Sequence, residues 1–406
     1  MSKGSLPTKE FSSVSTKDKS LERRASNLLM RLLALKGPSG DERAVVKFIS
    51  KELQKAGVPA AALTLDDAHH RSAMGGHTGN LVLKLPGTIR GPRRMLTAHM
   101  DTVPICQGAR PVREGRRIDS ADEHTGLGGD DRTGCGVLLT TALEIFRRGL
   151  PHPPLTFLWT VQEEVGLHGA RNAKLSLLGR PKLAFNFDGS HVNRLIVGAT
   201  GGYRMKIIIK GVASHAGGHP ERGVSAISIA SLAISDLVEK GWHGLIAKGR
   251  NQGTSNVGVI SGGQATNVVT DHVELRAEAR SHDPKFRLKI VNEIEKAFHR
   301  AAKKVKNIDK QAGSVMIDGQ LDYESFRLQE TEPCVQAARE AVGAESLEAD
   351  FAIANGGLDA NWLSARGIPT VSLGCGQNEI HTVDEWVNLD EYMHAVRVAL
   401  RLATAT

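Results

Sequence analysis

The chain has 406 residues, 40% of them hydrophobic and 24% charged, so it is long enough for two or three domains with a buried core. Its 52 Lys and Arg exceed its 44 Asp and Glu by eight charges, but the basic residues are spread along the chain and only 4% of residues are aromatic. This composition does not favour nucleic-acid binding. The four cysteines form no C-x-x-C pair, which argues against a disulfide framework and a thiolate metal site.

Residues 1–17 are polar and lack the apolar core of a signal peptide. No stretch approaches the roughly 18 apolar residues of a membrane helix. We therefore expect a soluble, cytoplasmic protein with a flexible tail over residues 1–17 and no membrane partner.

Helices and strands alternate in the first half of the chain. Apolar spacing predicts a helix over residues 18–35, and Ser39-Gly40-Asp41-Glu42 is expected to form the capping box of a second helix over residues 41–56. Strands are expected at 80–86, 93–99, 154–161 and 182–189, with a loop at 107–129 and a long helix at 134–147. This alternation predicts an α/β fold with a mostly parallel sheet covered by helices on both faces.

The order of elements changes after the glycine-rich stretch at residues 198–202. From Tyr203 it becomes strand, helix, two strands, helix and strand, which is the ferredoxin-like β-α-β-β-α-β order. The α/β alternation resumes near Pro333. We therefore expect a discontinuous first domain, residues 18–199 and 323–406, with an inserted ferredoxin-like α+β domain over residues 200–322.

Acidic and histidine residues follow several of the predicted strands and strand–helix turns. They are His99 and Asp101 in HMD, Asp130 and Asp131 in GGDD, Glu163 and Glu164 in QEE, Asp188 in NFDG, and His381 after TVSLGCGQNEI. Taken singly, each has an ordinary explanation, such as a helix N-cap for the aspartates or a solvated surface for the glutamates. In one doubly wound sheet, however, they would converge on one edge.

Two histidines with several carboxylates and no thiolate form a ligand set for zinc, cobalt or manganese. Two such ions about 3.5–4 Å apart can share a carboxylate and a water, and they make that water a nucleophile. One carboxylate of the Glu163–Glu164 pair can then bind metal while the other moves a proton, and Asp101 can orient the imidazole of His99. The pattern predicts metal-assisted hydrolysis of an amide or ester. No P-loop or G-x-S-x-G motif supports phosphoryl transfer or serine hydrolysis.

The motifs HMDTVP, GGDDRTG, QEEVGLHGA, NFDG and EIHTVDEW, in this order, resemble the dinuclear zinc exopeptidases of the peptidase T, aminoacylase and desuccinylase superfamily, and peptidase T-like tripeptidases above all. The resemblance implies two divalent metal ions, with zinc expected and cobalt or manganese as alternatives. One ion would be held by His99, Asp130 and Asp188, and the other by Asp130, Glu164 and His381.

The same resemblance assigns the remaining residues of the centre. Glu163 matches the general base, and Asp101 matches the carboxylate that clamps His99. Asp130 is preferred to Asp131 as the shared ligand because the family's bridging aspartate is followed by one residue and then a basic one, here Arg132. The family also implies a cis peptide bond after the bridging aspartate.

The inserted domain adds to the resemblance. SHAGGHPERGVSAI resembles the segment whose histidine, here His215, crosses a dimer interface to help hold the substrate carbonyl. Asn267 in GGQATNVV and Arg280 in AEARSHD match residues that bind the carboxylate end of the substrate, a role that suits a guanidinium. Without the resemblance, Arg280 is an interface or salt-bridged residue and Asn267 a turn former. The resemblance implies a homodimer formed through a lid domain, residues 200–322.

The function expected from the resemblance is a metal-dependent aminopeptidase that removes the N-terminal residue of short peptides. An N-acyl amino acid deacylase or carboxypeptidase with the same site is the alternative. A metal-binding interaction protein without catalysis is a more remote one.

Overall fold

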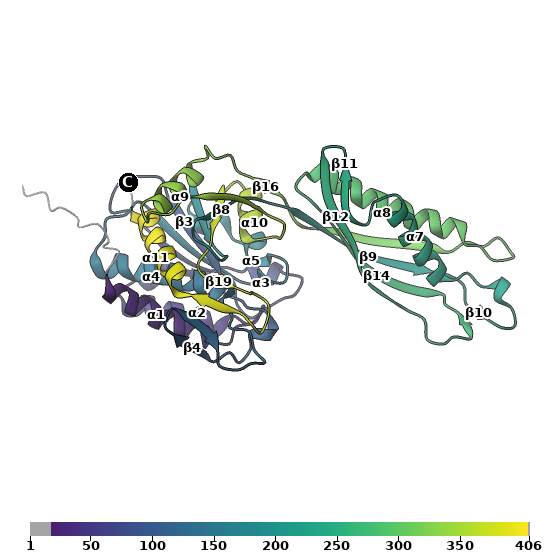
Figure 1. Ribbon diagram of the computed structural model, residues 1–406, viewed down its shortest axis with the longest axis horizontal. Helices are drawn as coiled ribbons and strands as arrows, with labels where there is room; N and C mark the ends of the chain where they lie inside the picture. The colour runs from purple at the N-terminus through teal and green to yellow at the C-terminus, as the bar shows by residue number, and fades with distance from the viewer. Residues whose placement is uncertain (1–17, 405–406) are drawn as a thin grey trace, which may run out of the picture. The chain divides into compact units, whose positions relative to one another are not determined.

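The computed structural model describes residues 18–404, and this chain divides into two compact units (Figure 1). Of the described residues, the first unit comprises 18–195, 330–351 and 371–404, and the second comprises 196–329 and 352–370. The predicted tail, residues 1–17, lies outside the described residues. Among residues 18–404, no helix combines the length and the apolar composition required to span a membrane.

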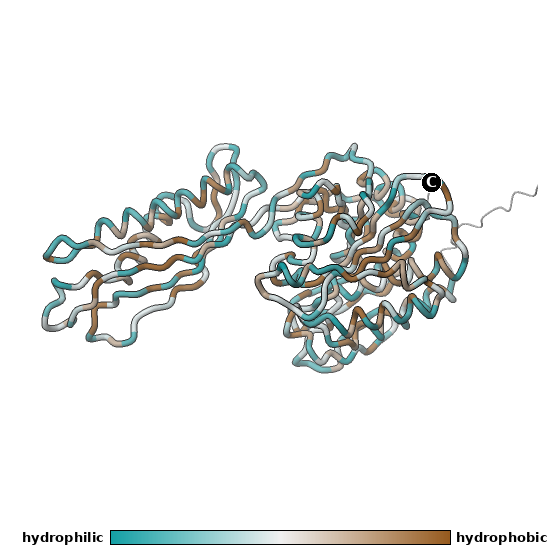
Figure 2. The backbone as a smooth tube through the Cα atoms, turned by 180° about the vertical axis from the view of Figure 1, so that it is seen from behind, coloured by the Kyte–Doolittle hydropathy of each residue, from teal (hydrophilic) through white to brown (hydrophobic). Residues whose placement is uncertain are grey.

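A sheet with the strand order β1-β2-β6-β3-β7-β18 forms the core of the first unit. These strands are β1 (Leu63–Leu65), β2 (Leu81–Leu85), β6 (Leu155–Thr160), β3 (Arg94–His99), β7 (Leu183–Phe187) and β18 (Thr370–Leu373). Strand β3 runs parallel to both β6 and β7, whereas β2 is antiparallel to β6 and to β1. The parallel strands are buried along their whole length, and Figure 2 shows hydrophobic residues gathered along them. Their carboxyl ends therefore meet at one edge of the sheet.

Helices pack around this sheet. They are α1 (Lys19–Leu33), α2 (Arg43–Lys55), α3 (Ala68–Arg71), α4 (Gly129–Arg148), α5 (His168–Asn172), α6 (Leu175–Leu178), α9 (Pro333–Gly343) and α11 (Leu389–Thr404). Helices α4 and α11 contact β3, and α9 contacts β7. Residues 129–145 of α4 are all buried, so the start of this helix lies inside the unit, beside the carboxyl ends of the strands.

The predicted capping box of α2 is wrong. The helix begins at Arg43, and the residue before it, Glu42, makes no side-chain cap hydrogen bond. Instead, the Ser39 hydroxyl donates to Asp101 Oδ2 (2.6 Å), and Glu42 Oε1 accepts from the backbone N–H of Gln162 (3.1 Å). Both side chains therefore reach away from their own helix, toward the ends of the strands.

The stretch predicted as a loop, residues 107–129, contains a hairpin. Its strands β4 (Pro111–Glu114) and β5 (Arg117–Ser120) pair antiparallel around a tight turn at Gly115, whose φ of 60° suits glycine. Together with β19 (Gln377–Asn378) and β20 (Trp386–Asn388) they form a four-stranded sheet in the order β19-β20-β5-β4. The loop prediction is therefore wrong for the middle of this stretch.

The second unit contains a five-stranded antiparallel sheet in the order β11-β12-β14-β9-β15. Its elements are β9 (Gly201–Lys210), α7 (Ala226–Glu239), β11 (Gly244–Lys248), β12 (Asn251–Gly262), β14 (His272–Ser281), α8 (Pro284–Lys304) and β15 (Ser314–Tyr323). Apart from the edge strand β11, this is the β-α-β-β-α-β order that the sequence suggests. The apolar residues of both helices and of the strands form one core cluster.

Shorter elements complete the second unit. Strands β8 (Arg194–Ala199) and β16 (Phe326–Arg327) pair antiparallel where the chain passes between the units, and β17 (Asp350–Ala354) pairs with β8 and precedes α10 (Asp359–Ala365). A ribbon of β10 (Ser214–His215) and β13 (Val268–Val269) lies apart from the large sheet. Residues 268–281 thus contain two strands, β13 and β14, where the predicted order has a single strand before the second helix.

Candidate metal centre

Seven of the ten site residues predicted from the sequence belong to the first unit, and its topology brings them together. His99 is the last residue of β3, Asp101 lies two residues further on, Glu163 and Glu164 follow β6, and Asp188 follows β7 directly. Asp130 lies in the first turn of α4, and His381 follows β19. Because β3, β6 and β7 are parallel neighbours, the residues after them occupy the same edge of the sheet.

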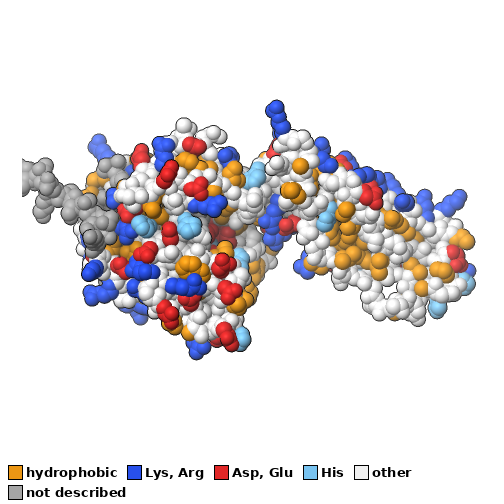
Figure 3. Space-filling view, viewed as in Figure 1, with side chains coloured by type: hydrophobic (Ala, Val, Ile, Leu, Met, Phe, Trp, Pro, Cys, Tyr) orange, Lys and Arg blue, Asp and Glu red, His pale blue; other side chains and the backbone are white. Residues whose placement is uncertain are grey.

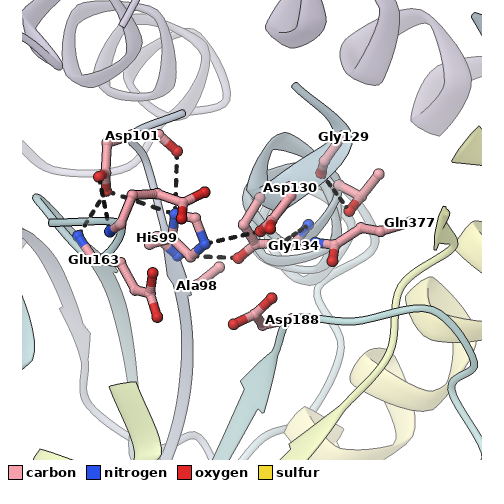
Figure 4. A network of polar contacts seen from close by, with 12 residues as sticks. Ala98, His99, Asp101, Gly129, Asp130, Gly134, Glu163, Asp188 and Gln377 are labelled. Carbon is pink, nitrogen blue, oxygen red and sulfur yellow. Dashed lines mark hydrogen bonds and ion pairs between the residues drawn. The ribbon is translucent and has the colours of Figure 1, made fainter. Parts of the chain in front are cut away.

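The carboxylate of Asp130 lies between two imidazoles. Its Oδ1 is 3.0 Å from Nε2 of His99 (Figure 4), and its Oδ2 is 3.2 Å from Nε2 of His381. Nε2 of His381 also lies 3.0 Å from Oε2 of Glu164. Each oxygen of this buried carboxylate therefore faces a different histidine, which is the arrangement of a ligand shared by two metal ions.

Two groups of possible ligand atoms share Asp130. In the first, one atom each from His99, Asp130 and Asp188 lie within 4.8 Å of one another, and in the second the same holds for Asp130, Glu164 and His381. Figure 4 shows the carboxylate of Asp188 beside His99 and Asp130. A third group joins His99 with Glu163 and Glu164, so Glu163 lies close to the centre without belonging to either of the groups that share Asp130.

The charges of the centre suit cations. Burial raises the pKa of Asp131 well above its ordinary value. The positive charge of His99 lowers this pKa, and the negative charges of Asp188 and Asp130 raise it further. Burial also raises the pKa of Glu164 more than the hydrogen bond from His381 lowers it. Crowded, buried carboxylates resist ionisation unless a cation compensates them. Together with the oxygen and imidazole donors, this excess of acid fits two divalent metal ions.

Both histidines hold protons strongly when no metal competes for them. Burial lowers the pKa of His99, but hydrogen bonds to Asp101 and Asp130 outweigh it and raise the pKa well above the ordinary value. Hydrogen bonds to Asp130 and Glu164 raise the pKa of His381 to about 10. A metal ion at either imidazole would take the place of the proton that each imidazole nitrogen shares with a carboxylate.

We expect the chelator-treated protein to lose stability as the pH rises. The folded-state pKa of His381, about 10, lies above its ordinary value of 6.5. The protonated imidazole therefore stabilises the fold fully below pH 6.5, and this contribution disappears as the pH rises through the folded-state pKa. Thermal unfolding of metal-free protein between pH 6 and pH 10 measures it. In a His381→Gln variant the melting temperature should decline less steeply with pH. Identical pH profiles of the two proteins would contradict the role of His381 in this pH dependence.

Asp101 is fully buried and holds both His99 and the glutamate pair. Nδ1 of His99 lies 3.1 Å from the backbone oxygen of Asp101 and 3.5 Å from its Oδ1. The same carboxylate accepts the backbone N–H of Glu163 (2.9 Å) and of Glu164 (3.2 Å). One residue therefore fixes the orientation of the imidazole, through its backbone oxygen and its carboxylate, and the position of the neighbouring strand end, as is usual for partners of metal ligands.

Three further residues, Glu385, Asp131 and Gln377, organise the loop that carries Asp130, and of these only Asp131 is among the candidates named from the sequence. Glu385 accepts the backbone N–H groups of Gly128 (2.6 Å) and Asp130 (3.0 Å), and it is 1% exposed. Asp131 accepts the backbone N–H of His99 (3.0 Å) and the side-chain amide of Gln377 (2.8 Å). The expected cis peptide bond is present between Asp130 and Asp131. The sequence feature that could have identified Glu385 is its place in the motif EIHTVDEW, four residues after His381.

The other three predicted residues belong to the second unit. His215 pairs with Val268 in the β10–β13 ribbon, and the N–H of Ala216 donates to the backbone oxygen of Asn267 (2.9 Å). The structure thus places Asn267, which directly precedes β13, close to His215 of β10, and both residues are exposed. Arg280 lies on β14 and forms an ion pair with Glu278 (3.0 Å). Their roles toward a substrate stay predictions.

Comparisons with known proteins agree with this geometry. The family model "Peptidase family M20/M25/M40" matches residues 95–405. The uncharacterized protein YqjE of Bacillus subtilis is 30% identical over 382 residues, which are 94% of this chain and 98% of that protein. Two crystal structures superpose over 94% of this chain and 98% of theirs at 30% identity: a tripeptidase from Staphylococcus aureus (TM-score 0.85) and the aminopeptidase PepT from Bacillus cereus (TM-score 0.83).

Proposed function

The chain belongs to peptidase family M20/M25/M40, and within that family we propose that it is a two-metal aminopeptidase which removes the N-terminal residue of short peptides. The observation that carries the proposal is the Asp130 carboxylate, which faces His99 with one oxygen and His381 with the other. The likeness to a tripeptidase and to an aminopeptidase, each 30% identical, supports the choice of free-amine peptides as substrates.

We assign the metal ligands from the two groups that share Asp130. His99, Asp130 and Asp188 would hold one ion, and Asp130, Glu164 and His381 would hold the other. Zinc is the ion we propose, because imidazole and carboxylate donors without thiolate suit it. When bound, the ions would lower the pKa of a water molecule and withdraw electron density from the scissile carbonyl.

Glu163 is the proposed general base. It is 8% exposed, it lies with Glu164 near His99, and it is absent from both groups that share Asp130. In the proposed reaction, water attacks the carbonyl carbon of the first peptide bond while a carboxylate oxygen of Glu163 accepts its proton. The same proton then passes to the amide nitrogen as the C–N bond breaks, which leaves an amino acid and a shortened peptide.

The second unit has two proposed roles, as the source of substrate-binding residues and as the dimer contact. His215 would hold the substrate carbonyl, and Asn267 and Arg280 would bind the carboxylate end of the peptide. Exposed apolar side chains gather on one face of this unit (Figure 3), and α7 contributes Ile227, Leu232 and Val238, which are 44%, 37% and 57% exposed. An apolar surface of this kind on a monomer supports contact with a second copy of the chain.

Hydrolysis of free and N-blocked peptides tests the proposed substrate class. Metal-loaded protein should release the N-terminal residue of di- and tripeptides, and a chelator should stop the reaction. N-acetylation of the same tripeptide should lower kcat/KM by about 10²-fold or more, because a site built for a free amine is left with unpaired polar groups. Product analysis by mass spectrometry measures both substrates. Preferential cleavage of the acylated substrate would instead identify a deacylase, and release of the C-terminal residue would identify a carboxypeptidase.

A further inference from the structure

Three consecutive backbone N–H groups after β6 donate to carboxylates. The N–H of Gln162 donates to Glu42 Oε1 (3.1 Å), that of Glu163 to Asp101 Oδ1 (2.9 Å), and that of Glu164 to Asp101 Oδ2 (3.2 Å). Glu42, Asp101 and Gln162 are each 0% exposed. The backbone that presents the proposed base is therefore fixed by two fully buried acids that come from different parts of the chain.

The conformation of Gln162 creates this arrangement. Its φ of 54° lies in the left-handed region, which a residue with a side chain adopts only when its surroundings impose it. A residue in this region redirects the backbone, and here the N–H of Gln162 points to Glu42 while the next two N–H groups point to Asp101. The Gln162 side chain is itself held, because its Nε2 donates to the backbone oxygen of Gly75 and its Oε1 accepts from the hydroxyl of Ser72. The turn is thus fixed from both its side chain and its backbone.

The segment 37–42 makes further contacts with Asp101 and with the residues after the strands. Ser39 donates to Asp101 Oδ2 (2.6 Å), and Glu42 Oε1 also accepts the N–H of Gly40 (2.8 Å). The backbone oxygen of Gly37 accepts from the N–H of Thr102 (3.1 Å) and from the guanidinium of Arg132 (3.2 Å). A Cβ at Gly37 would lie 2.5 Å from that guanidinium, so the close approach requires glycine. The segment is therefore docked on the ends of the strands rather than used as a helix cap.

We propose that Glu42 and Ser39 are positioning residues for the base Glu163, and that they act by holding the backbone of residues 162–164 in the turn that aims its carboxylate at the substrate. The inference rests on the proposed function, since it presumes that Glu163 is the base. Glu42 acts through the N–H of Gln162, and Ser39 acts through Asp101. Neither side chain needs to touch the substrate, and neither belongs to a proposed group of metal ligands.

Loss of the Glu42 carboxylate should release the turn. In Glu42→Ala the buried N–H of Gln162 has no acceptor, so the left-handed turn loses the contact that orients it. A displacement of a reacting group by about 1 Å can lower a rate by about 10²-fold. We therefore expect kcat to fall by about 10- to 100-fold, with KM within about twofold of the unchanged protein and two metal ions retained. Glu42→Gln keeps an acceptor oxygen and should restore most of the activity.

Amide hydrogen exchange of metal-free protein tests the contact without any turnover. The amides of residues 162–164 should exchange faster in Glu42→Ala and not in Glu42→Gln, and in Ser39→Ala the amides of residues 163 and 164 should exchange faster. Asp18→Ala is the matched control. Like Glu42, Asp18 directly precedes a helix and its carboxylate accepts two backbone N–H groups, but it lies far along the chain from residues 162–164. The substitution should lower the melting temperature and leave both kcat and the exchange of residues 162–164 unchanged.

Each outcome decides the inference. Unchanged exchange and unchanged kcat in Glu42→Ala would overturn it, as would an equal loss of kcat in Asp18→Ala. If Glu42→Ala does not fold, Glu42→Asp takes its place, since its shorter side chain withdraws the acceptor while keeping a carboxyl group. Normal kcat and normal exchange in that variant would overturn the inference. If the unchanged protein hydrolyses no peptide, the proposed function fails, while hydrogen exchange still shows whether Glu42 holds the turn.

Discussion

Glu163→Ala is expected to lower kcat by about 10²- to 10⁴-fold while the protein still binds two metal ions. This range is the usual contribution of a positioned acid–base group to a hydrolytic step. Glu163 lies outside both groups of ligand atoms that share Asp130, so its removal should leave the metal sites intact. Steady-state kinetics on a tripeptide, with metal content measured by elemental analysis of the same sample, separates the two effects. Glu163→Gln should be similarly slow, because an amide cannot accept the proton.

The neighbouring glutamate supplies the reciprocal experiment. Glu164→Ala should lower the metal content toward one ion per chain, because Glu164 belongs to the group with Asp130 and His381. Glu123→Ala, which removes an acid whose side chain is 87% exposed, should change neither the metal content nor kcat. Because His99 lies near both glutamates, the opposite division of roles is the specific competing outcome. Metal loss in Glu163→Ala together with full metal content in Glu164→Ala would reverse the assignment.

The candidate site could be predicted in large part because its residues follow buried strands. A strand such as β6 is recognisable from its apolar run, and the ends of parallel neighbours must meet at one edge. His99, Glu163, Glu164 and Asp188 are therefore brought together by topology alone. Topology alone does not place His381, because it follows the strand β19, which has only two residues. Its place with the other residues could be predicted only from the order of the motifs.

The features that could not be predicted from the sequence depend on contacts between distant segments. Ser39-Gly40-Asp41-Glu42 has the letters of a capping box, and nothing in those four residues indicates that Glu42 instead reaches Gln162, 120 positions away. Glu385 likewise contacts Asp130 across 255 positions. The β4–β5 hairpin could not be predicted because its strands have four residues each and only one of the eight residues is buried, so no apolar alternation marks them.

Asp130→Ala is expected to remove both metal ions, because Asp130 belongs to both groups of ligand atoms. Loss of a residue that merely orients a ligand weakens metal binding by about 10- to 100-fold, so loss of a shared ligand should exceed that range at both sites. Asp188→Ala, which affects only the group with His99, should leave one ion per chain. Calorimetric titration of chelator-treated protein with Zn²⁺ measures the number of sites and their affinities.

The same variant bears on how the charges of the centre are balanced. In the metal-free protein, Asp130 contacts the imidazoles of His99 and His381, and these two contacts hold its pKa below the ordinary value against the effect of burial. Asp130→Ala should therefore also lower the pKa of both histidines. A pH titration followed by the NMR signals of the two imidazoles measures these pKa values. The exposed Asp384, on the same loop as His381, provides the control, since Asp384→Ala should leave both sites and both pKa values unchanged. Two sites of normal affinity in Asp130→Ala would show that this carboxylate does not join the two halves of the centre.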